Sequence, residues 1–202
     1  MFCLPRHVFL NIQHTPSIIP KKQQVRYFWE YVNMMFNKPD PERIKSLGPD
    51  RACAEWVLRN GGKVVWANGK KLDDYNLLPP ETQSVPKIVV IDGTDSSISH
   101  YGFSHLSGCT KLEKIILHNN KYIDDRAMKG LSYGLATLSY VQVSECVNVG
   151  DQGLKEIKAL NSLQTLILFN LSGVTDLEEC KQYLQSQLPN CKILGQEDKM
   201  CN

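Results

Sequence analysis

The feature that most constrains the fold is a sequence pattern that recurs about every 25 residues in the second half of the chain. Three segments superpose when the chain is aligned on itself. Each segment opens with three apolar residues at fixed spacing, and these triplets are Leu112/Ile115/Leu117, Leu138/Val141/Val143 and Leu163/Leu166/Leu168. A short strand that lends alternate side chains to a shared core, followed by a helix that returns the chain, produces such a pattern.

The pattern continues beyond each triplet. The next inward position holds Asn120, Cys146 or Leu171. Three residues later comes another apolar residue, Ile123, Val149 or Val174, and a helical stretch follows it. We therefore expect an α/β fold in which a leucine-rich-repeat solenoid of about four repeats spans residues 87–194. Cys146 should be structural, because buried thiols are mostly inert.

The stretch "KIVVIDGTDSSI", residues 87–98, fits this frame as the first repeat. Aligning Ile98 with Ile123 makes Val90 correspond to Ile115, and it places Asp92 where later repeats have a core aliphatic residue. Burying an unpaired carboxylate is costly, so Asp92 would need a backbone amide, an arginine or a metal as its partner. A short register shift that turns Asp92 outward is the alternative.

Residues 25–86 predict a small helical N-terminal capping domain with a hairpin. A first helix over 24–37 carries apolar residues at helical spacing on one face, namely Val25, Phe28, Trp29, Val32 and Phe36. Asp40 is a suitable N-cap for a second helix that ends near Leu47, and a third helix stops at Gly61. This block is too small to bury much apolar surface alone, so we expect it to pack on the repeats.

The pair Asn68-Gly69 in "KVVWANGKK" predicts a tight hairpin with a type I′ turn. The proline-rich stretch from Leu72 to Pro86 is expected to be a loop.

The N-terminal 29 residues contain no Asp or Glu. We expect residues 1–24 to be a mitochondrial transit peptide, with a disordered leader as the alternative, and residues 195–202 to be a tail. A net charge of +2 does not call for a nucleic-acid partner. The seven cysteines are scattered and lack zinc-ligand spacing, which suits a reducing compartment.

Four stretches carry a family resemblance: "RYFWEYVNMMFNK" (26–38), "RIKSLGPDRACAEWVLRNGG" (43–62), "DYNLLP" (74–79) and "IDGTDSSI" (91–98). Together they resemble the mitochondrial ATP synthase subunit s family, also called coupling factor B, over roughly residues 25–190. The distal membrane-arm assembly component proteins share these motifs.

The resemblance implies a non-catalytic protein on the matrix side of the mitochondrial inner membrane. It would bind the proton-channel sector of ATP synthase, support coupling and proton transport, and reach the membrane through protein contacts. The alternative is an assembly factor for the distal membrane arm of respiratory complex I.

The resemblance also implies a magnesium ion between the cap and the first repeat, with ligand positions that fall on Gly61 and Thr94. Asp92 or Asp95 could supply nearby negative charge, which suits an ion that prefers oxygen ligands. This chain departs from the family where other members carry a Cys-x-Cys pair, because residues 118–120 are His, Asn and Asn. A role that depends on a dithiol therefore cannot be carried over.

Two other classes of function fit the sequence less well. A ubiquitin-ligase substrate adaptor would need an F-box before the repeats, and the helices of the cap do not provide one. An enzyme would need a catalytic constellation, but the five histidines form no HExxH motif and the chain has no GxSxG or P-loop. His100 and His105 lie near Ser99 and Ser104, and chance neighbours explain them better than a triad does.

A protein partner should bind on the exposed strand face of the repeats. The residues expected to contact it form an apolar and aromatic surface with polar members: Ile116, His118, Tyr140, Gln142, Ile167 and Phe169. Coverage of this surface by the cap or by the C-terminal tail is the alternative.

Overall fold

The structure, a computed structural model, describes residues 21–134 and 136–195, with the side chains of residues 21–26 excepted. The predicted leader (1–24) thus lies outside the described residues except for its last four positions, which belong to the first helix. The predicted tail lies outside them from residue 196 onward.

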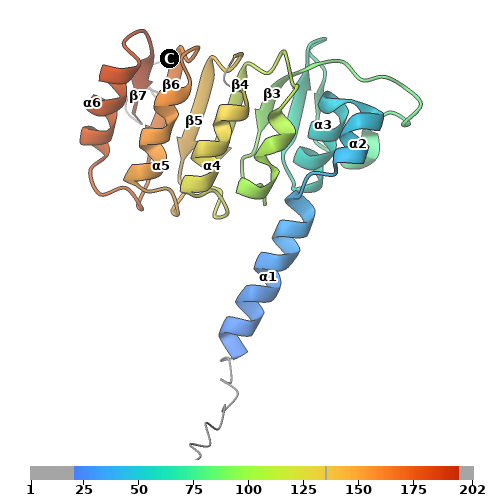
Figure 1. Cartoon of the computed structure of the whole chain (residues 1–202), viewed down its shortest axis with the longest axis horizontal. Helices are drawn as coiled ribbons and strands as arrows, with labels where there is room; N and C mark the ends of the chain where they lie inside the picture. Colours follow the sequence, from blue (N-terminus) through green and yellow to red (C-terminus); the bar gives the residue numbers. More distant parts are fainter. Residues whose placement is uncertain (1–20, 135, 196–202) are drawn as a thin grey trace, which may run out of the picture.

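A seven-stranded sheet runs the length of the molecule in the order β2-β1-β3-β4-β5-β6-β7 (Figure 1). The first two strands pair antiparallel with each other and with β3, whereas β3 to β7 are all parallel. The strands are β1 (Lys63–Trp66), β2 (Lys71–Leu72), β3 (Ile88–Asp92), β4 (Lys114–His118), β5 (Tyr140–Ser144), β6 (Thr165–Phe169) and β7 (Lys192–Leu194).

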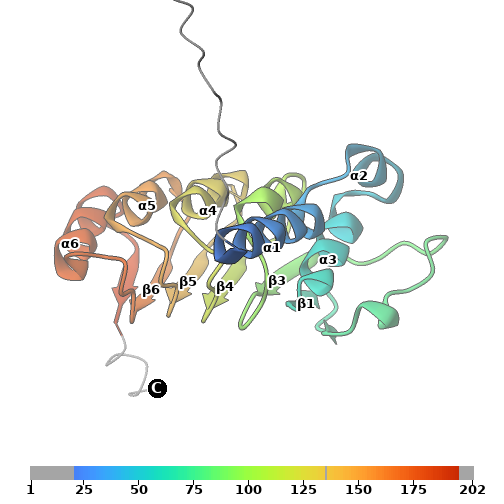
Figure 2. The same cartoon turned by 90° about the horizontal axis from the view of Figure 1, so that it is seen from below.

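Helices cover one face of this sheet, and Figure 2 shows them as a layer along the strands. The strands β3 to β6 are each followed by a helical segment, so the fold is a mixed α/β arrangement in which chain order and spatial order agree from β3 to β7. These segments are the 3₁₀ helix η2 (His100–Leu106) and the helices α4 (Asp125–Gly130), α5 (Asp151–Glu156) and α6 (Leu177–Gln187). Three shorter 3₁₀ turns are η1 (Tyr75–Leu77), η3 (Leu131–Gly134) and η4 (Ile157–Ala159).

The apolar triplets of the aligned segments are buried between the sheet and the helices. All nine of their side chains are at most 3% exposed, and they belong to one hydrophobic core that continues into the cap through Trp56 and Val64. The predicted inward positions are confirmed as well, because Asn120 and Cys146 are fully buried and Leu171 is 6% exposed. The cap and the following array therefore share a sheet and a core.

A single residue with left-handed backbone follows each of the strands β3 to β6 and turns the chain toward the helix layer. Its φ lies between 48° and 55° in all cases, at Asp95, Asn119, Glu145 and Asn170. Short polar residues tolerate this conformation better than branched apolar ones. This recurring turn fixes the structural register of the segments.

The predicted core position of Asp92 is wrong. Ile91, and not Val90 as predicted, pairs with Ile115 and is buried. Asp92 therefore points to the other face of the sheet, where it is half-buried. From its strand to Ile98, the first segment has one residue fewer than the later segments have over the corresponding stretch. The missing residue falls after the strand, between Ser96 and Ile98. Counting back across this gap shifted the register by one, which reverses every side chain of a strand.

The three predicted cap helices are present as α1 (Lys21–Asn37), α2 (Pro41–Leu47) and α3 (Pro49–Arg59). The Asp40 carboxylate accepts hydrogen bonds from the first amides of α2, as expected of an N-cap. Gly61 follows α3 with a φ of +81°, the left-handed conformation that ends many helices at a glycine. The helix α1 begins three residues before the predicted start.

The predicted type I′ turn of the hairpin is wrong in detail. Trp66 N–H donates to the Lys70 carbonyl, which closes a three-residue loop, and only Gly69 within it has a positive φ. A type I′ turn would need positive φ at two central residues, whereas a three-residue loop needs it only at the last. β1 has a bulge between Val65 and Trp66, where its register against β3 shifts.

The predicted apolar face of α1 does not pack on the body of the protein. Phe28, Trp29 and Phe36 of that face are between 49% and 59% accessible. The polar residues Asn33 and Asn37 face the body of the protein instead, and Asn37 is fully buried. Figure 1 shows why so little apolar surface is covered, since α1 projects away from the body, and among the helices its main contacts are with α3 and η2.

The helix α3 meets η2 at a close contact. A Cβ at Gly102 would lie only 2.1 Å from Trp56 Nε1, so glycine is required there. The His105 ring stacks on the same indole, with ring centroids 5.2 Å apart. Burial, aided by the nearby charge of Arg59, lowers the pKa of His105 to about 4. His105 is thus a packing residue and not part of a catalytic triad.

This buried histidine should make stability depend on pH. Its pKa is lower when folded than when unfolded, so the unfolded state binds more protons between about pH 6.5 and pH 4, and stability falls as the pH falls through that window. Between pH 7 and pH 5 we expect a loss of about 2 kcal/mol from this residue, measured by urea unfolding. His105→Phe should remove that share of the slope, and an unchanged slope in the variant would contradict the assignment.

Candidate functional site

The helix α1 is held by the side chain of Asn37, which lies where α1, α3 and the segment after β3 meet. Its amide nitrogen donates to the Asn33 carbonyl, to Asn60 Oδ1 and to the Ser97 carbonyl, at 2.9, 3.0 and 3.0 Å. Its oxygen accepts from Trp56 Nε1 and from the Ser99 amide, both at 2.9 Å. One buried amide thus joins three parts of the chain, and each of its polar atoms is satisfied.

Two neighbouring asparagines extend this junction. Asn33 donates to the Ser97 carbonyl at 2.7 Å, and Asn60 donates to the Phe36 carbonyl at the end of α1 and to the Trp56 carbonyl. Sequence reasoning missed these residues because it followed the apolar face of the helix. Asparagines four residues apart on the opposite face, at 33 and 37, were the available signal.

Anchoring by the polar face leaves the apolar face of α1 outward. Six large apolar and aromatic side chains of α1 are between 49% and 59% exposed: Tyr27, Phe28, Trp29, Tyr31, Met35 and Phe36. These six residues, called the α1 face below, form an arc around the helix on the side away from Asn33 and Asn37. Contiguous apolar surface on a soluble domain usually marks an interaction site.

The second candidate surface is the side of the sheet that carries no helices, called the strand face below. The register puts Ile116, Gln142 and Ile167 in one row across neighbouring strands. The other predicted partner residues flank this row on the same face, namely His118, Tyr140 and Phe169. All six therefore share one face, but Gln142 and Ile167 are only 4% and 5% exposed and lie between larger neighbours.

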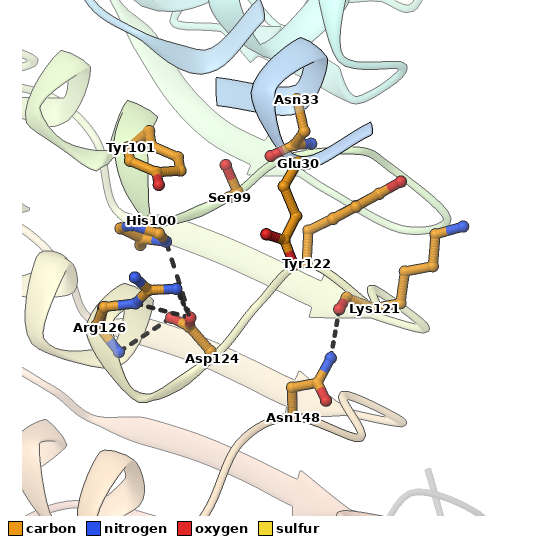
Figure 3. A pocket seen from close by; sticks show the side chains of 10 residues that line it. All are labelled: Glu30, Asn33, Ser99, His100, Tyr101, Lys121, Tyr122, Asp124, Arg126 and Asn148. Atoms are coloured by element: carbon orange, nitrogen blue, oxygen red, sulfur yellow. Dashed lines mark hydrogen bonds and ion pairs between the residues drawn. The ribbon is translucent and has the colours of Figure 1, made fainter. Parts of the chain in front are cut away.

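A groove of about 390 Å³ separates α1 from the turns after β3 and β4 (Figure 3). Asp124 caps α4 in its wall and accepts two hydrogen bonds from the Arg126 guanidinium, at 2.9 and 2.6 Å. His100 Nδ1 lies 3.8 Å from the same carboxylate, and burial lowers the pKa of His100. The charges at the base of the groove are thus largely satisfied by one another, which does not favour a catalytic role.

The residues proposed for magnesium meet where α3 ends against β3. The Ser97 amide donates to the Asn60 carbonyl, and a Cβ at Gly62 would lie 3.0 Å from the Asp92 carbonyl oxygen, so the Gly61 turn lies against the loop that carries Thr94. The Thr94 hydroxyl donates to Asp92 Oδ1 at 2.6 Å.

The two acidic residues at this junction behave differently. Asp95 accepts from Asn119 and so faces the next strand, whereas Asp92 stays with Thr94. The metal-ligating atoms available near Gly61 and Thr94 are oxygens, the ligand type that Mg²⁺ prefers. No cluster of three or more His, Cys, Asp or Glu side chains suited to a metal occurs in residues 27–134 and 136–195. A magnesium ion here would therefore depend mainly on carbonyl, hydroxyl and water oxygens, with the Asp92 carboxylate as the nearby charge.

The cysteines of the described region are buried thiols. Cys146 lies 3.5 Å from the Leu117 and Ser144 carbonyls, and burial raises its pKa to about 11. Burial raises the pKa of Cys191 to about 11 as well. Such thiols are protonated at neutral pH, which agrees with the structural role predicted for Cys146.

Comparison with known proteins identifies the family. Subunit s of the mitochondrial ATP synthase of Rattus norvegicus is 40% identical over 179 residues, which span 87% of this chain and 90% of the relative. The Homo sapiens protein of the same name is 36% identical over the same shares of the two chains. This chain belongs to the ATP synthase subunit s family. A scan against models of protein families finds no match.

A more distant relative of this chain is distal membrane arm assembly component 2 of Drosophila melanogaster. It is 25% identical over 207 residues, which cover 93% of this chain and 72% of the relative. Within the described part of the chain, none of the helices combines the length and the apolar character needed to cross a membrane.

The asparagine junction leads to a stability prediction. Asn37→Leu leaves the Trp56 indole N–H and the Ser99 amide buried without their acceptor, and each unsatisfied group costs about 1–3 kcal/mol. We expect the free energy of unfolding in urea to fall by about 3–5 kcal/mol. Asn161→Leu, at an exposed turn, is the control and should change it by less than about 0.5 kcal/mol. A loss below about 1 kcal/mol for Asn37→Leu would contradict the role of this amide.

Proposed function

We propose that the protein is a non-catalytic accessory component of the mitochondrial ATP synthase. It binds the proton-channel sector from the matrix side of the inner membrane, and it supports coupling of proton transport to ATP synthesis. The names of its relatives with 35–40% identity support a mitochondrial protein associated with ATP synthase. The observation that carries a binding role is the α1 face, six large apolar side chains that the protein turns away from its own core.

The geometry of α1 supports its use in binding. The helix is anchored near its C-terminal end by buried hydrogen bonds, so the outward side chains are presented by a fixed element. Aromatic side chains such as Trp29, Phe28 and Tyr31 supply much contact area for little loss of conformational entropy, and they dominate many interfaces. The rest of the chain acts as the scaffold, which we interpret as a leucine-rich-repeat solenoid of four repeats closed by the cap.

A second candidate function is assembly of the distal membrane arm of complex I. The observation that favours it is the relative from Drosophila melanogaster, whose name is distal membrane arm assembly component 2 and which spans nearly the whole chain at 25% identity. Both candidates are binding functions of one scaffold, so the identity of the bound complex separates them.

Affinity purification tests both candidates. The tagged protein is expressed in mitochondria, gently solubilised and purified, and the associated complexes are identified by mass spectrometry. We expect ATP synthase subunits, and we expect Phe28→Glu with Trp29→Glu to reduce their recovery at least about tenfold, because charges replace exposed apolar anchors.

The matched control changes exposed apolar residues elsewhere. Tyr133→Glu with Val147→Glu alters side chains that are 54% and 51% exposed on other elements, and it should leave recovery unchanged. Recovery of complex I intermediates without ATP synthase subunits would overturn the first candidate in favour of the second. Equal losses in both double variants would contradict a specific role for the α1 face.

We also propose that Mg²⁺ binds where the cap meets the first segment of the array, near Gly61 and Thr94. Oxygen donors gather at this junction, and the half-buried Asp92 carboxylate offers negative charge on its outward side. Asp95 would contribute less, because its carboxylate accepts a hydrogen bond from Asn119. The ion would tie the end of α3 to the loop after β3.

Calorimetric titration with magnesium chloride tests this site. Thr94→Val removes a hydroxyl oxygen and Asp92→Asn removes the charge, so each should weaken binding about tenfold or more. Thr110→Val, at an exposed turn, is the control and should bind as the unchanged protein does. Unaltered affinity in both site variants would remove this junction as the metal site.

A further inference from the structure

The strand face carries an uneven distribution of charge that sequence reasoning did not single out. Side chains on adjacent strands that are directly paired point to the same face. The pairing of Lys63 with Asp92 and of Val65 with Lys71 puts both lysines of the hairpin on the strand face. Lys114 of the central strand β4 and Lys192 of the edge strand β7 fall in the row that contains Tyr140 and Thr165.

The charged residues of the described strands on this face are thus four lysines and one aspartate. Lys71 and Lys192 are exposed, and Lys63 and Lys114 are half-buried. The single acidic residue, Asp92, already accepts hydrogen bonds from the Thr94 amide and hydroxyl. The strand face is therefore positively charged although the whole chain has a net charge of only +2.

A chain of hydrogen bonds crosses the middle of the same face. Gln142 Nε2 donates to Ser144 Oγ at 2.9 Å, and Ser144 Oγ lies 2.9 Å from His118 Nδ1. The serine oxygen accepts from Gln142, and in the tautomer where its own hydrogen is donated to the imidazole, neutral His118 carries its proton on Nε2. In that tautomer the half-buried histidine presents an N–H donor, beside the Phe169 ring at a centroid distance of 6.1 Å.

We infer that the strand face binds an acidic segment of a partner protein, one that places a carboxylate on His118 and an apolar side chain beside it. Carboxylates complement the four lysines and the Nε2–H of His118, and charge-assisted hydrogen bonds of this kind are short and strong. The half-buried Ile116 and Phe169 suit the apolar neighbour.

A nucleic acid fits the strand face less well, because the centre of that face is apolar and its polar groups form hydrogen bonds with one another. The inference rests on the proposed function in taking the partner to be a component of a mitochondrial membrane complex. It adds the chemistry of the segment that is bound.

Carbodiimide cross-linking tests the inference, because this reagent joins a lysine amine to a carboxylate in direct contact. Tagged full-length protein is cross-linked in intact mitochondria, purified and mapped by mass spectrometry. We expect cross-links from Lys114 and Lys192 to aspartate or glutamate side chains of a co-purified protein. Lys114→Glu with Lys192→Glu should reduce recovery of that protein at least about tenfold. Lys45→Glu with Lys129→Glu, at exposed positions on helices, is the matched control and should not.

The outcomes separate the inference from the proposed function. Cross-links from these lysines to a protein outside ATP synthase would support the inference while contradicting the proposed partner. Recovery of ATP synthase with no intermolecular cross-link from the strand-face lysines would overturn the inference and leave the proposed function standing. Binding to cardiolipin vesicles or to RNA that is lost in Lys114→Glu with Lys192→Glu, without protein cross-links, would also overturn it.

The protonation of His118 gives a readout that needs no partner. Nitrogen-15 NMR of the isolated protein at neutral pH should show the tautomer with hydrogen on Nε2, and Ser144→Ala should shift the population away from it. A wild-type histidine protonated on Nδ1 would overturn the orientation of the donor. The cross-links would then report on the charges alone.

Discussion

The buried side-chain amide of Asn37 determines which side of α1 is exposed to other molecules. Its five hydrogen bonds tie α1 to α3 and to the loop after β3, and they do so through the polar side of α1. A helix fixed by its polar side must direct its apolar side elsewhere. The outward α1 face is therefore a direct consequence of the hydrogen bonds that anchor the helix, and the energy of those bonds offsets the exposure of aromatic surface.

The two surfaces of the molecule differ in chemistry. The α1 face is aromatic and lies on a projecting helix, whereas the strand face is positively charged and partly apolar. The groove of Figure 3 lies between α1 and the turns that follow β3 and β4, on the helix side of the sheet. A partner that contacts both surfaces would wrap around one edge of the array, and a large complex with several subunits provides such a shape more readily than a single small domain does.

The sequence predicted much of the fold because periodicity is a local property. The triplets from Leu112 onward, the cap of α2 at Asp40 and the glycine stop after α3 all follow from spacing and residue type, and the structure confirms them. The register of β3 failed for a different reason. The one-residue gap after Asp95 lies in a turn, where no apolar periodicity marks it, so the position of Asp92 could not be read from spacing alone.

The candidate sites were harder to predict than the core. The direction of α1 depended on buried asparagines whose partners, such as Trp56 and Ser97, are distant in sequence. The predicted strand-face residues do share one face, but the burial of Gln142 and Ile167 depends on the size of their neighbours across strands. The lysines of that face come from the hairpin, the central strand β4 and the edge strand β7, and only the pairing of the hairpin with β3 brings Lys63 and Lys71 to it.

The order of the strands has a further consequence for the two edges of the sheet. An array that adds one parallel strand after another leaves an unpaired strand at each edge, and open edges invite pairing between copies. Here the edge strands are β2, with two residues, and β7, with three, and each begins with an exposed lysine. Short, charged edges discourage such pairing, so the array resists polymerisation and its broad faces remain accessible to other proteins.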